Sequence, residues 1–390
     1  MSRTIIEVHA LQTVPPSNVN RDDTGSPKTA VFGGVRRARV SSQAWKRATR
    51  LAFDSLLDRA DLGVRTKRVV DLVADRVVEL RPDLADSATT LAEGVVAATG
   101  LKLEKTKRAK SGGESSDHQE TGYLVFVSRR QVDLLAGKAV ELASADDVAA
   151  ALKTFKGKGL LDTEHSVDVS LFGRMVADVT DLNVDAAAQV AHAISVHAVD
   201  NEYDYFTAVD DVKHEAADED AGAGMIGTVE FNSSTLYRYA TVDVDRLRYN
   251  LGDTEATRRA VRAFVRAFVE SMPTGKQNTF ANRTLPEAVV VTVRDTQSVN
   301  LVGAFEEAVT ADTRPGREAT RMEVAAQRLG ERAGEISDVL GQRPVATWVV
   351  AIGDARTGLD ASWKDAERTT LPGLYDAVGA IVGDRLGAPA

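Results

Sequence analysis

Positive charge gathers in one short stretch of this chain, residues 20–50. The stretch holds eight Lys or Arg residues and only two acids, a local charge of +6, whereas the whole chain carries −9. The basic residues are Arg21, Lys28, Arg36, Arg37, Arg39, Lys46, Arg47 and Arg50. An acidic protein gains no solubility by collecting its cations in one place. The stretch therefore predicts a single, defined site for a polyanion.

The second half of this stretch has the pattern of an amphipathic helix. It runs from Gln43 to about Leu57, and Ser41 or Ser42 is a suitable N-cap. At about 100° per residue, polar and basic side chains fall on one side and an apolar stripe on the other. The polar side holds Gln43, Lys46, Arg47 and Arg50, and the stripe holds Trp45, Ala48, Ala52 and Leu56.

Cations near the start of a helix oppose its macrodipole, so an unpaired cluster there costs stability. A phosphate removes this conflict, because free backbone N–H groups, serine hydroxyls and basic side chains can all bind it. We expect Gly33 and Gly34, just upstream, to let the backbone approach such a ligand. The alternative is a solvated basic face on a surface helix.

Composition narrows the class of protein. With 390 residues, 43% hydrophobic and 27% charged, the chain is typical of a globular protein of two or three domains. Cysteine is absent, which excludes disulfides, thiolate metal sites and a thiol nucleophile. Glu7 and His9 interrupt the apolar run that a signal peptide needs, and no stretch is long enough to span a membrane. We expect a cytoplasmic protein without membrane contact.

Hydrophobic periodicity predicts interleaved strands and helices. Strands are expected at residues 4–11, 122–127, 167–171, 190–199, 231–244, 289–293 and 347–352, and helices at residues 69–80, 86–98, 146–155, 253–272, 318–333 and 371–386. The strand at 4–11 alternates and should be half-buried. Segments 102–120 and 210–227 are polar and should be exposed loops; contact of Lys102–Lys110 with DNA is left open. Antiparallel pairing is easily built, so the predicted fold class is α+β, with helices on one face of a sheet.

Two matches to nucleotide-binding motifs fail on their context, so no cofactor is expected. Gly222 to Gly227 fits G-x-G-x-x-G but opens a strand instead of a helix. Gly275-Lys276-Gln277 lacks the hydroxyl that a phosphate loop uses to hold magnesium. Lys276 and Gln277 remain candidates for contact with a phosphate or a base edge.

Carboxylate pairs leave a metal-dependent nuclease as an alternative function. The candidates are Asp22, Asp23, Asp210 and Asp211, although no nearby His or Glu completes a ligand set. His192 and His197 lie five apart on an expected strand, so they face opposite sides and cannot share a metal. We interpret both as structural or surface histidines.

Eight motifs, in order from Asn20 to Thr279, resemble one known family. They are NRDD, FGG-x-RR-x-R-x-SSQ-x-x-KRA-x-R, V-D-x-x-L-x-GRM, AHAI-x-x-H-x-VD, D-x-FTAVDD, GT-x-EF, YRYA and KQ-x-T. Together they cover about two thirds of the chain. They are similar to the backbone subunit (CasC) of the type I-E CRISPR Cascade complex.

This resemblance implies a modified RNA-recognition-motif palm, ferredoxin-like in type, with a helical fingers insertion and a β-hairpin thumb. The palm would comprise residues 1–50, 162–199 and 231–390, the fingers residues 51–161 and the thumb residues 200–230. Copies of the subunit would polymerise head to tail along the guide RNA (crRNA), beside other Cascade subunits, and leave bases exposed to pair with target DNA. The subunit would not be an enzyme.

The resemblance also assigns roles to individual residues. Those implied to hold guide-RNA phosphates are Arg21, Lys28, Ser41, Gln43, Lys46, Arg47 and Arg50. Arg174 and Met175 would meet the RNA, with Met175 against a base, and Tyr205, Phe206 and Thr207 would form the thumb wedge. Tyr205 replaces the Trp usual in the family, which keeps stacking but with less area.

Two questions stay open at this stage. Phe231, Tyr237 and Tyr239 are either core residues or a base-stacking platform, and the absence of the usual RNP1 string favours core. A further alternative is an RNA-free scaffold protein whose basic helix meets an acidic protein surface.

Overall fold

The computed structural model describes residues 3–105, 119–176, 178–208, 225–313, 316 and 318–387. The chain divides into two compact units. The sheet unit comprises Met1–Ala52, Val190–Val242 and Val261–Ala390, and the helical unit comprises Phe53–Gln189 and Asp243–Ala260. Residues 162–189, which we assigned to the palm, therefore belong to the same unit as the expected fingers.

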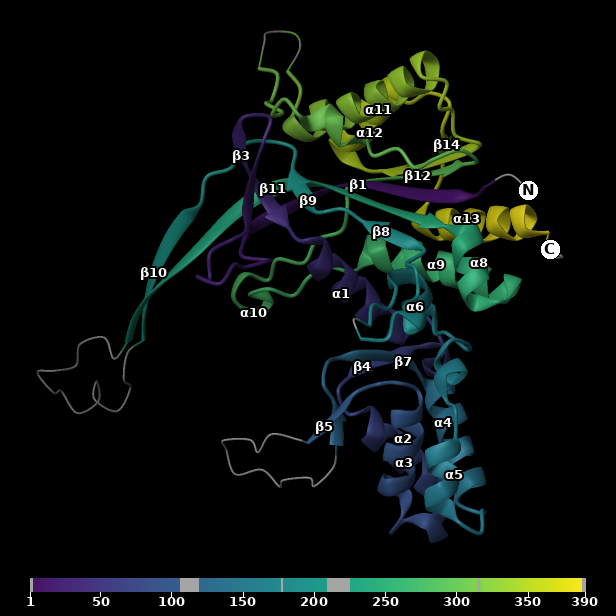
Figure 1. Ribbon diagram of the computed structural model, residues 1–390. Coiled ribbons are helices and arrows are strands. Elements are labelled where there is room, and N and C mark those ends of the chain that lie inside the picture. Colours follow the sequence, from purple (N-terminus) through teal and green to yellow (C-terminus); the bar gives the residue numbers. More distant parts are fainter. Residues whose placement is uncertain are drawn as a thin grey trace, which may run out of the picture. The chain divides into compact units, whose positions relative to one another are not determined.

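A large mixed β-sheet forms the centre of the sheet unit (Figure 1). Its strands follow the order β14-β13-β12-β1-β11-β9-β3-β2. Their bounds are β1 (Ile5–Ser17), β2 (Thr29–Phe32), β3 (Val35–Val40), β9 (Ala193–Ser195), β11 (Met225–Asp243), β12 (Ala288–Arg294), β13 (Ala346–Ala351) and β14 (Glu367–Arg368). β13 and β14 are parallel, whereas β1 and β12 are antiparallel. The expectation of a mixed helix-and-strand fold is confirmed.

Helices cover both faces of this sheet, so the prediction that they lie on one face is wrong (Figure 1). Apolar side chains of α11 and α12 share a core with β1, β11, β12 and β13, while α13 and the second half of α9 lie on the opposite side. The helices with residues in this unit are α1 (Ser42–Ala52), α9 (Thr254–Glu270), α10 (Gln277–Phe280), α11 (Arg321–Val339), α12 (Gly353–Ser362) and α13 (Leu371–Leu386). A short 3-10 helix, η6 (Leu301–Phe305), precedes α11.

β1 is buried on both faces, which corrects the prediction of a half-buried strand. Glu7 and His9 are fully buried. Glu7 Oε2 accepts a hydrogen bond from Arg294 Nε at 2.5 Å, and its Oε1 accepts from the Tyr239 hydroxyl at 2.9 Å. His9 Nδ1 lies 2.9 Å from the Tyr237 hydroxyl, and burial lowers the pKa of His9 to about 4. The two tyrosines are therefore core residues and do not form a base-stacking platform.

The β2–β3 turn packs closely against the end of η6. Gly33 has a φ of +59°, and a Cβ there would lie 1.6 Å from the Glu306 carbonyl oxygen, so only glycine fits. Arg37 is buried, and its Nη2 donates to the carbonyl oxygens of Phe305 and Glu306 at 2.9 Å each. Gly33 thus permits close approach of protein backbone and not of a ligand, contrary to our expectation.

Gly33 and its neighbour Gly34 form a matched pair for a stability test. Both have positive φ, but a Cβ at Gly34 would meet nothing within 4 Å. Gly33→Ala should lower the free energy of unfolding by roughly 2 kcal/mol more than Gly34→Ala, because both substitutions strain the backbone but only Gly33→Ala also overpacks against the Glu306 carbonyl. Urea unfolding of the purified protein, followed by circular dichroism, measures both. Equal decreases would show that the turn is not tightly packed on η6.

The helical unit is built around α2, α3 and α4, which enclose a core of valine, alanine and leucine. Its helices are α2 (Val69–Leu80), α3 (Ala88–Ala98), α4 (Arg129–Leu142), α5 (Val148–Thr154), α6 (Val167–Phe172) and α8 (Val244–Leu251), and its strands are β4 (Gly63–Thr66), β5 (Leu103–Lys105), β6 (Gln119–Thr121) and β7 (Val125–Ser128). The strand β8 (Ala188–Val190) spans the sequence boundary of the two units. Residues 106–110 of the basic segment lie outside the described residues.

The strand predicted at residues 167–171 is in fact helix α6. All five residues are buried, including the polar Asp168 and Ser170. Asp168 Oδ1 accepts hydrogen bonds from Gly63 N at 2.8 Å and from Ser166 Oγ at 2.7 Å. Asp168 is therefore satisfied inside the unit, and the alternation of apolar and polar residues does not mark a solvent face. No helix in the described part of the chain has the length and apolar character needed to cross a membrane.

Candidate nucleic-acid interface

Helix α1 is held against the sheet by Trp45, which is 1% exposed. The Arg238 guanidinium lies 3.8 Å from the centroid of the Trp45 ring, and the Phe268 ring lies 6.5 Å from it. Arg238 donates to Gln12 Oε1 at 2.6 Å, and burial lowers its pKa to about 9. The inward orientation predicted for Trp45 is confirmed. Thr49, one turn later, is the other buried residue of α1.

The opposite side of α1 presents the predicted contact residues. Gln43 and Arg47 are exposed, whereas Lys46 and Arg50 are half-buried. Burial lowers the pKa of Lys46. Within the described residues, neither Lys46 nor Arg47 forms an ion pair. A partly desolvated cation without a counter-ion is costly, and a bound anion would relieve that cost. α1 ends at Ala52, so it is shorter than predicted.

The start of α1 is fixed by three polar contacts. Ser41 is buried and its hydroxyl accepts a hydrogen bond from Ala44 N at 3.4 Å, which confirms it as the N-cap. Ser41 N donates to Asn20 Oδ1 at 2.8 Å, and Ser42 N donates to His192 Nδ1 at 2.9 Å. The first turn of the helix is thus tied both to the loop before β2 and to the segment before β9.

The loop before β2 brings two more predicted cations to this place. Besides its bond to Ser41, Asn20 accepts a hydrogen bond at its carbonyl oxygen from Lys28 N at 2.9 Å. Arg21 forms an isolated β-bridge with Pro27, which closes the loop between them. Arg21 is exposed and Lys28 half-buried. Both cations are therefore anchored through Asn20 to the N-cap of α1.

A third segment joins the loop at Gly275. A Cβ at this glycine would lie 2.1 Å from the Val19 carbonyl oxygen, so the two backbones touch. Residues 19–25 and Gly275 line an open surface hollow of about 500 Å³. Lys276, in a left-handed conformation with φ of 50°, and Gln277 follow at the start of α10. The sequence indicated Lys276 and Gln277 as candidates for contact with a phosphate or a base edge. The structure brings them beside the loop that holds Arg21 and Lys28.

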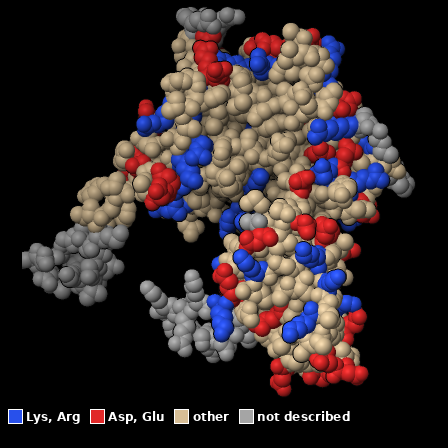
Figure 2. All heavy atoms as spheres, viewed as in Figure 1, with Lys and Arg blue, Asp and Glu red and all other residues tan. Residues whose placement is uncertain are grey.

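Figure 2 shows that Lys and Arg side chains gather on the visible face over the region labelled β3 and α1 in Figure 1. The structure thus assembles most of the predicted phosphate-binding residues within the sheet unit. Those brought together are Arg21, Lys28, Ser41, Gln43, Lys46, Arg47, Lys276 and Gln277. We call these eight residues the cationic surface.

Arg174 does not fit the predicted role in RNA binding. It is 5% exposed, and its guanidinium donates to Leu182 O at 2.7 Å and to Leu161 O at 2.6 Å. Burial lowers the pKa of Arg174 to about 10. Its donors are engaged inside the helical unit, so we remove it from the interface. The next residue, Met175, is 84% exposed and available for contact.

The expected thumb begins as a β-hairpin. β10 (Glu202–Ala208) pairs antiparallel with the first part of β11, with Tyr205 opposite Thr228 and Phe206 opposite Gly227. Tyr205 is 67% exposed and Phe206 42% exposed. A Cβ at Gly227 would lie 2.5 Å from the Phe206 ring, so the ring covers this glycine. Residues 209–224, including Gly222 and the acidic segment, lie outside the described residues.

The carboxylates of the nuclease alternative do not form a site in the described residues. Asp22 Oδ1 accepts hydrogen bonds from Thr24 N, Thr24 Oγ1 and Ser26 N at 2.9, 2.7 and 3.0 Å. The bond from the Thr24 hydroxyl holds the pKa of Asp22 below its usual value. Across the part of the chain that is described, no three His, Cys, Asp or Glu side chains are grouped to hold a metal. Asp210 and Asp211 lie outside it.

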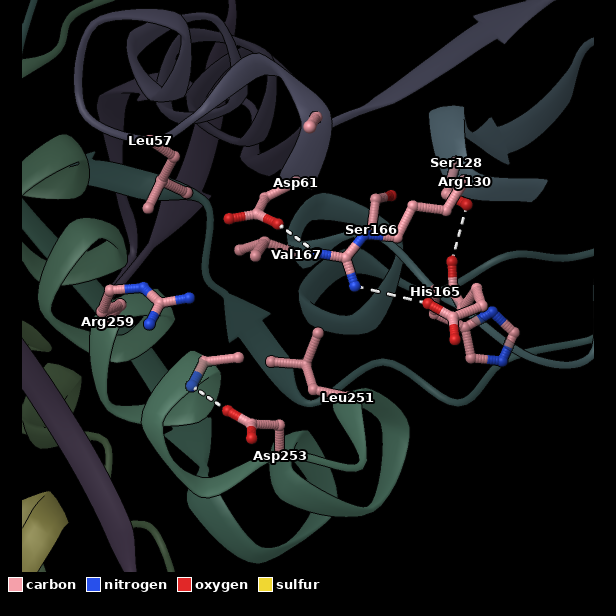
Figure 3. A pocket seen from close by; sticks show the side chains of 13 residues that line it. Leu57, Asp61, Ser128, Arg130, His165, Ser166, Val167, Leu251, Asp253 and Arg259 are labelled. Carbon is pink, nitrogen blue, oxygen red and sulfur yellow. Dashed lines mark hydrogen bonds and ion pairs between the residues drawn. The ribbon is translucent and has the colours of Figure 1, made fainter. Parts of the chain in front are cut away.

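A separate cavity of about 350 Å³ lies in the helical unit (Figure 3). Its Arg130 pairs with Asp61 Oδ1 at 3.0 Å and with Glu164 Oε2 at 3.3 Å. Asp253 Oδ1 accepts from Ala256 N at 2.5 Å and caps α9, as the sequence predicted. Acids and bases line this cavity together, so it lacks the excess of positive charge that a polyanion site needs.

Sequence reasoning missed His192 as a neighbour of the candidate interface. β3 and β9 are antiparallel, with Val40 opposite Ala193, so His192 follows opposite Ser41. This pairing joins segments about 150 residues apart, and no local pattern shows it. The AHAI motif marked the segment but gave the histidine no role.

Comparison of the sequence and the structure with known proteins identifies the family of this chain. Residues 6–377 match the family model of the CT1975-like proteins, and the chain belongs to that family. Its structure is similar to a chain of a "CRISPR RNA-guided surveillance complex, pre-nicking", with a TM-score of 0.81 and 36% identity over 97% of this chain and 100% of that chain. A chain of a second "CRISPR RNA-guided surveillance complex" is 34% identical, with a TM-score of 0.70, over 97% of this chain and 99% of that chain. No curated protein matches. The resemblance to a CRISPR protein is confirmed at this level.

Proposed function

We propose that this protein is a non-catalytic backbone subunit of a type I-E Cascade complex, which binds the phosphates of a guide RNA through its cationic surface. One observation carries the proposal. Lys46 is partly desolvated and has no ion pair among the described residues, and it stands beside Arg47 at the positive end of α1. An anionic ligand removes the cost of this arrangement.

Phosphate contacts suit a guide holder, because spacers differ in sequence and backbone contacts do not read bases. Base pairing between guide and target then supplies specificity, the division of labour known in other RNA-guided effectors. In this proposal Met175 meets a base, and Tyr205 and Phe206 wedge the strand at intervals so that segments of bases stay free. Further copies bind head to tail along the RNA, together with other Cascade subunits, on an RNA-recognition-motif palm in the cytoplasm.

Binding through phosphates predicts a strong dependence on salt. With about five phosphates neutralised per subunit and about −0.7 per phosphate on single strands, log K should fall with log salt at a slope of roughly −3 to −4. Filter binding of an unstructured RNA at several salt concentrations measures this slope. An RNA-free scaffold protein would retain no RNA even at low salt, and its preparations would show the 260/280 nm absorbance ratio of protein alone.

The nuclease alternative makes a separate and opposite prediction. It requires cleavage of RNA or DNA that depends on magnesium and is abolished in Asp22→Asn. Because Asp22 is engaged in its own loop, we expect intact substrates after incubation with magnesium. If the wild type cleaves nucleic acid and Asp22→Asn or Asp210→Asn abolishes that cleavage, the protein is a nuclease and our proposal is wrong.

A further inference from the structure

His192 occupies a defined place at the start of α1. Its Nδ1 accepts the backbone N–H of Ser42 at 2.9 Å, and the β3–β9 register places it opposite Ser41. Because Nδ1 acts as the acceptor, the neutral ring carries its proton on Nε2. The ring thus caps an N–H group that would otherwise be free to bind an anion.

The surroundings of His192 favour its neutral form in the free protein. Its side chain is exposed, and the charged groups that act on it are Arg39 on β3 and Lys28 in the loop before β2. Partial desolvation, then the charge of Arg39 and that of Lys28, lowers the pKa of His192. Among the residues that the structure describes, none hydrogen-bonds to His192 Nε2. Nδ1 accepts a hydrogen bond from the start of α1, and Nε2 can donate one to a ligand.

We propose that His192 is a further residue of the cationic surface, and that its imidazole takes up a proton from solvent when an RNA phosphate binds beside it. This inference rests on the proposed function. The added proton goes to Nδ1, which can then no longer accept from Ser42 N–H. Both ring nitrogens and the released Ser42 amide become donors, and the phosphate oxygens accept from them.

The sign of the resulting pH dependence follows from the charges. In the free protein Arg39 and Lys28 disfavour the imidazolium, whereas in the complex the phosphate favours it, so the pKa of His192 is higher in the complex. RNA binding therefore takes up protons, and affinity rises as pH falls from the pKa of the complex to that of the free protein. Each unit of pKa difference gives about tenfold tighter binding, with a slope of log K against pH approaching about −1 per subunit.

The test compares wild type with His192→Asn across pH 6, 7 and 8 at constant salt, by filter binding of an unstructured RNA. The Asn side-chain oxygen still accepts from Ser42 N but cannot titrate. We expect similar affinities at pH 8 and roughly tenfold tighter binding by wild type at pH 6. His165→Asn serves as the matched control, because the pKa of His165 is also lowered by burial but its ring contacts Gln131 in the helical unit. It should keep the wild-type profile.

A second measurement reads His192 itself. Nitrogen-15 NMR of labelled histidine, with the His192 signal assigned by its disappearance in His192→Asn, should show Nε2–H in the free protein at pH 8 and a raised pKa with RNA. If wild type binds RNA but shares its pH profile with His192→Asn, or if the pKa of His192 does not rise, this inference fails and the proposed function stands. If no RNA binds at any pH, both fail.

Discussion

Charge reversal at Lys46 and Arg47 is expected to reduce RNA affinity about a thousandfold and to leave the protein folded. Each substitution to Glu removes a charge-assisted hydrogen bond worth about 1.5–3 kcal/mol and adds repulsion from the phosphate. The salt slope should also become shallower, by roughly 0.7 for each phosphate that is no longer neutralised. Filter binding at two salt concentrations measures both effects.

The fold should survive because α1 is anchored from its other side. Trp45 packs under Arg238 and near Phe268, and neither interaction involves Lys46 or Arg47. Acidic side chains near the N-terminus of a helix are favourable for the macrodipole. Circular dichroism and the urea midpoint should therefore match those of wild type.

A matched control places two reversals elsewhere on the sheet unit. Arg332→Glu on α11 with Arg356→Glu on α12 changes the net charge by the same amount, and both arginines lie on helices remote in sequence from the cationic surface. This variant should bind RNA within about threefold of wild type, as expected if local interactions outweigh net charge. Unchanged affinity in the Lys46/Arg47 variant, or an equal decrease in the two variants, would contradict the assigned interface.

The parts of this site that were predictable depend on local sequence. The N-cap at Ser41 or Ser42, the inward Trp45 and the outward Arg47 follow from residue types and helical spacing over a few residues. All three predictions are confirmed, with Ser41 as the cap. Local charge density also singled out the segment whose cations the structure anchors around the start of α1. These signals need no knowledge of what packs against the helix, because a helix fixes its own periodicity.

Predictions failed where burial depends on distant partners. Arg37 looked like one more surface cation, but it is buried on carbonyl groups of η6, about 270 residues away. Glu7 looked like the solvent side of a strand, but Arg294 and Tyr239 satisfy it inside the sheet. Arg174 belongs to a motif whose residue types do not say whether the side chain faces RNA or the interior. Charged residues buried with partners are rare, so pattern reasoning places them outside.

The bounds of the units illustrate the same point. Residues 243–260 join the helical unit although 231–242 belong to the sheet unit, and α9 passes from one to the other without a glycine or proline to mark the change. The boundary at residue 260 can be found only from what each half of the helix packs against. His192 was overlooked for a related reason, because its position beside the start of α1 comes from the pairing of β9 with β3.

Substitutions in the β10–β11 hairpin are expected to have a large effect on the capture of target DNA. Tyr205→Ala with Phe206→Ala should leave guide-RNA affinity within about twofold of wild type, but weaken capture of target DNA by the RNA-loaded complex about a hundredfold. Stacking of one aromatic ring on a base is worth about 1–3 kcal/mol, and this variant removes two rings. Neither residue belongs to the cationic surface, so phosphate binding should be unaffected. Gel-shift titration of assembled complexes with a matched target measures the effect.

Tyr203 supplies the matched control for this experiment. It lies on the same strand and the same face as Tyr205, and both are 67% exposed. Tyr203→Ala removes an equally exposed ring that the family motif does not assign, so it should change target affinity little. If Tyr203→Ala weakens target capture as much as the double variant does, exposed aromatic area on the hairpin matters and the wedge positions do not. If the double variant captures target as well as wild type, the hairpin contributes no wedge, and the spacing of free bases must be set by the phosphate contacts alone.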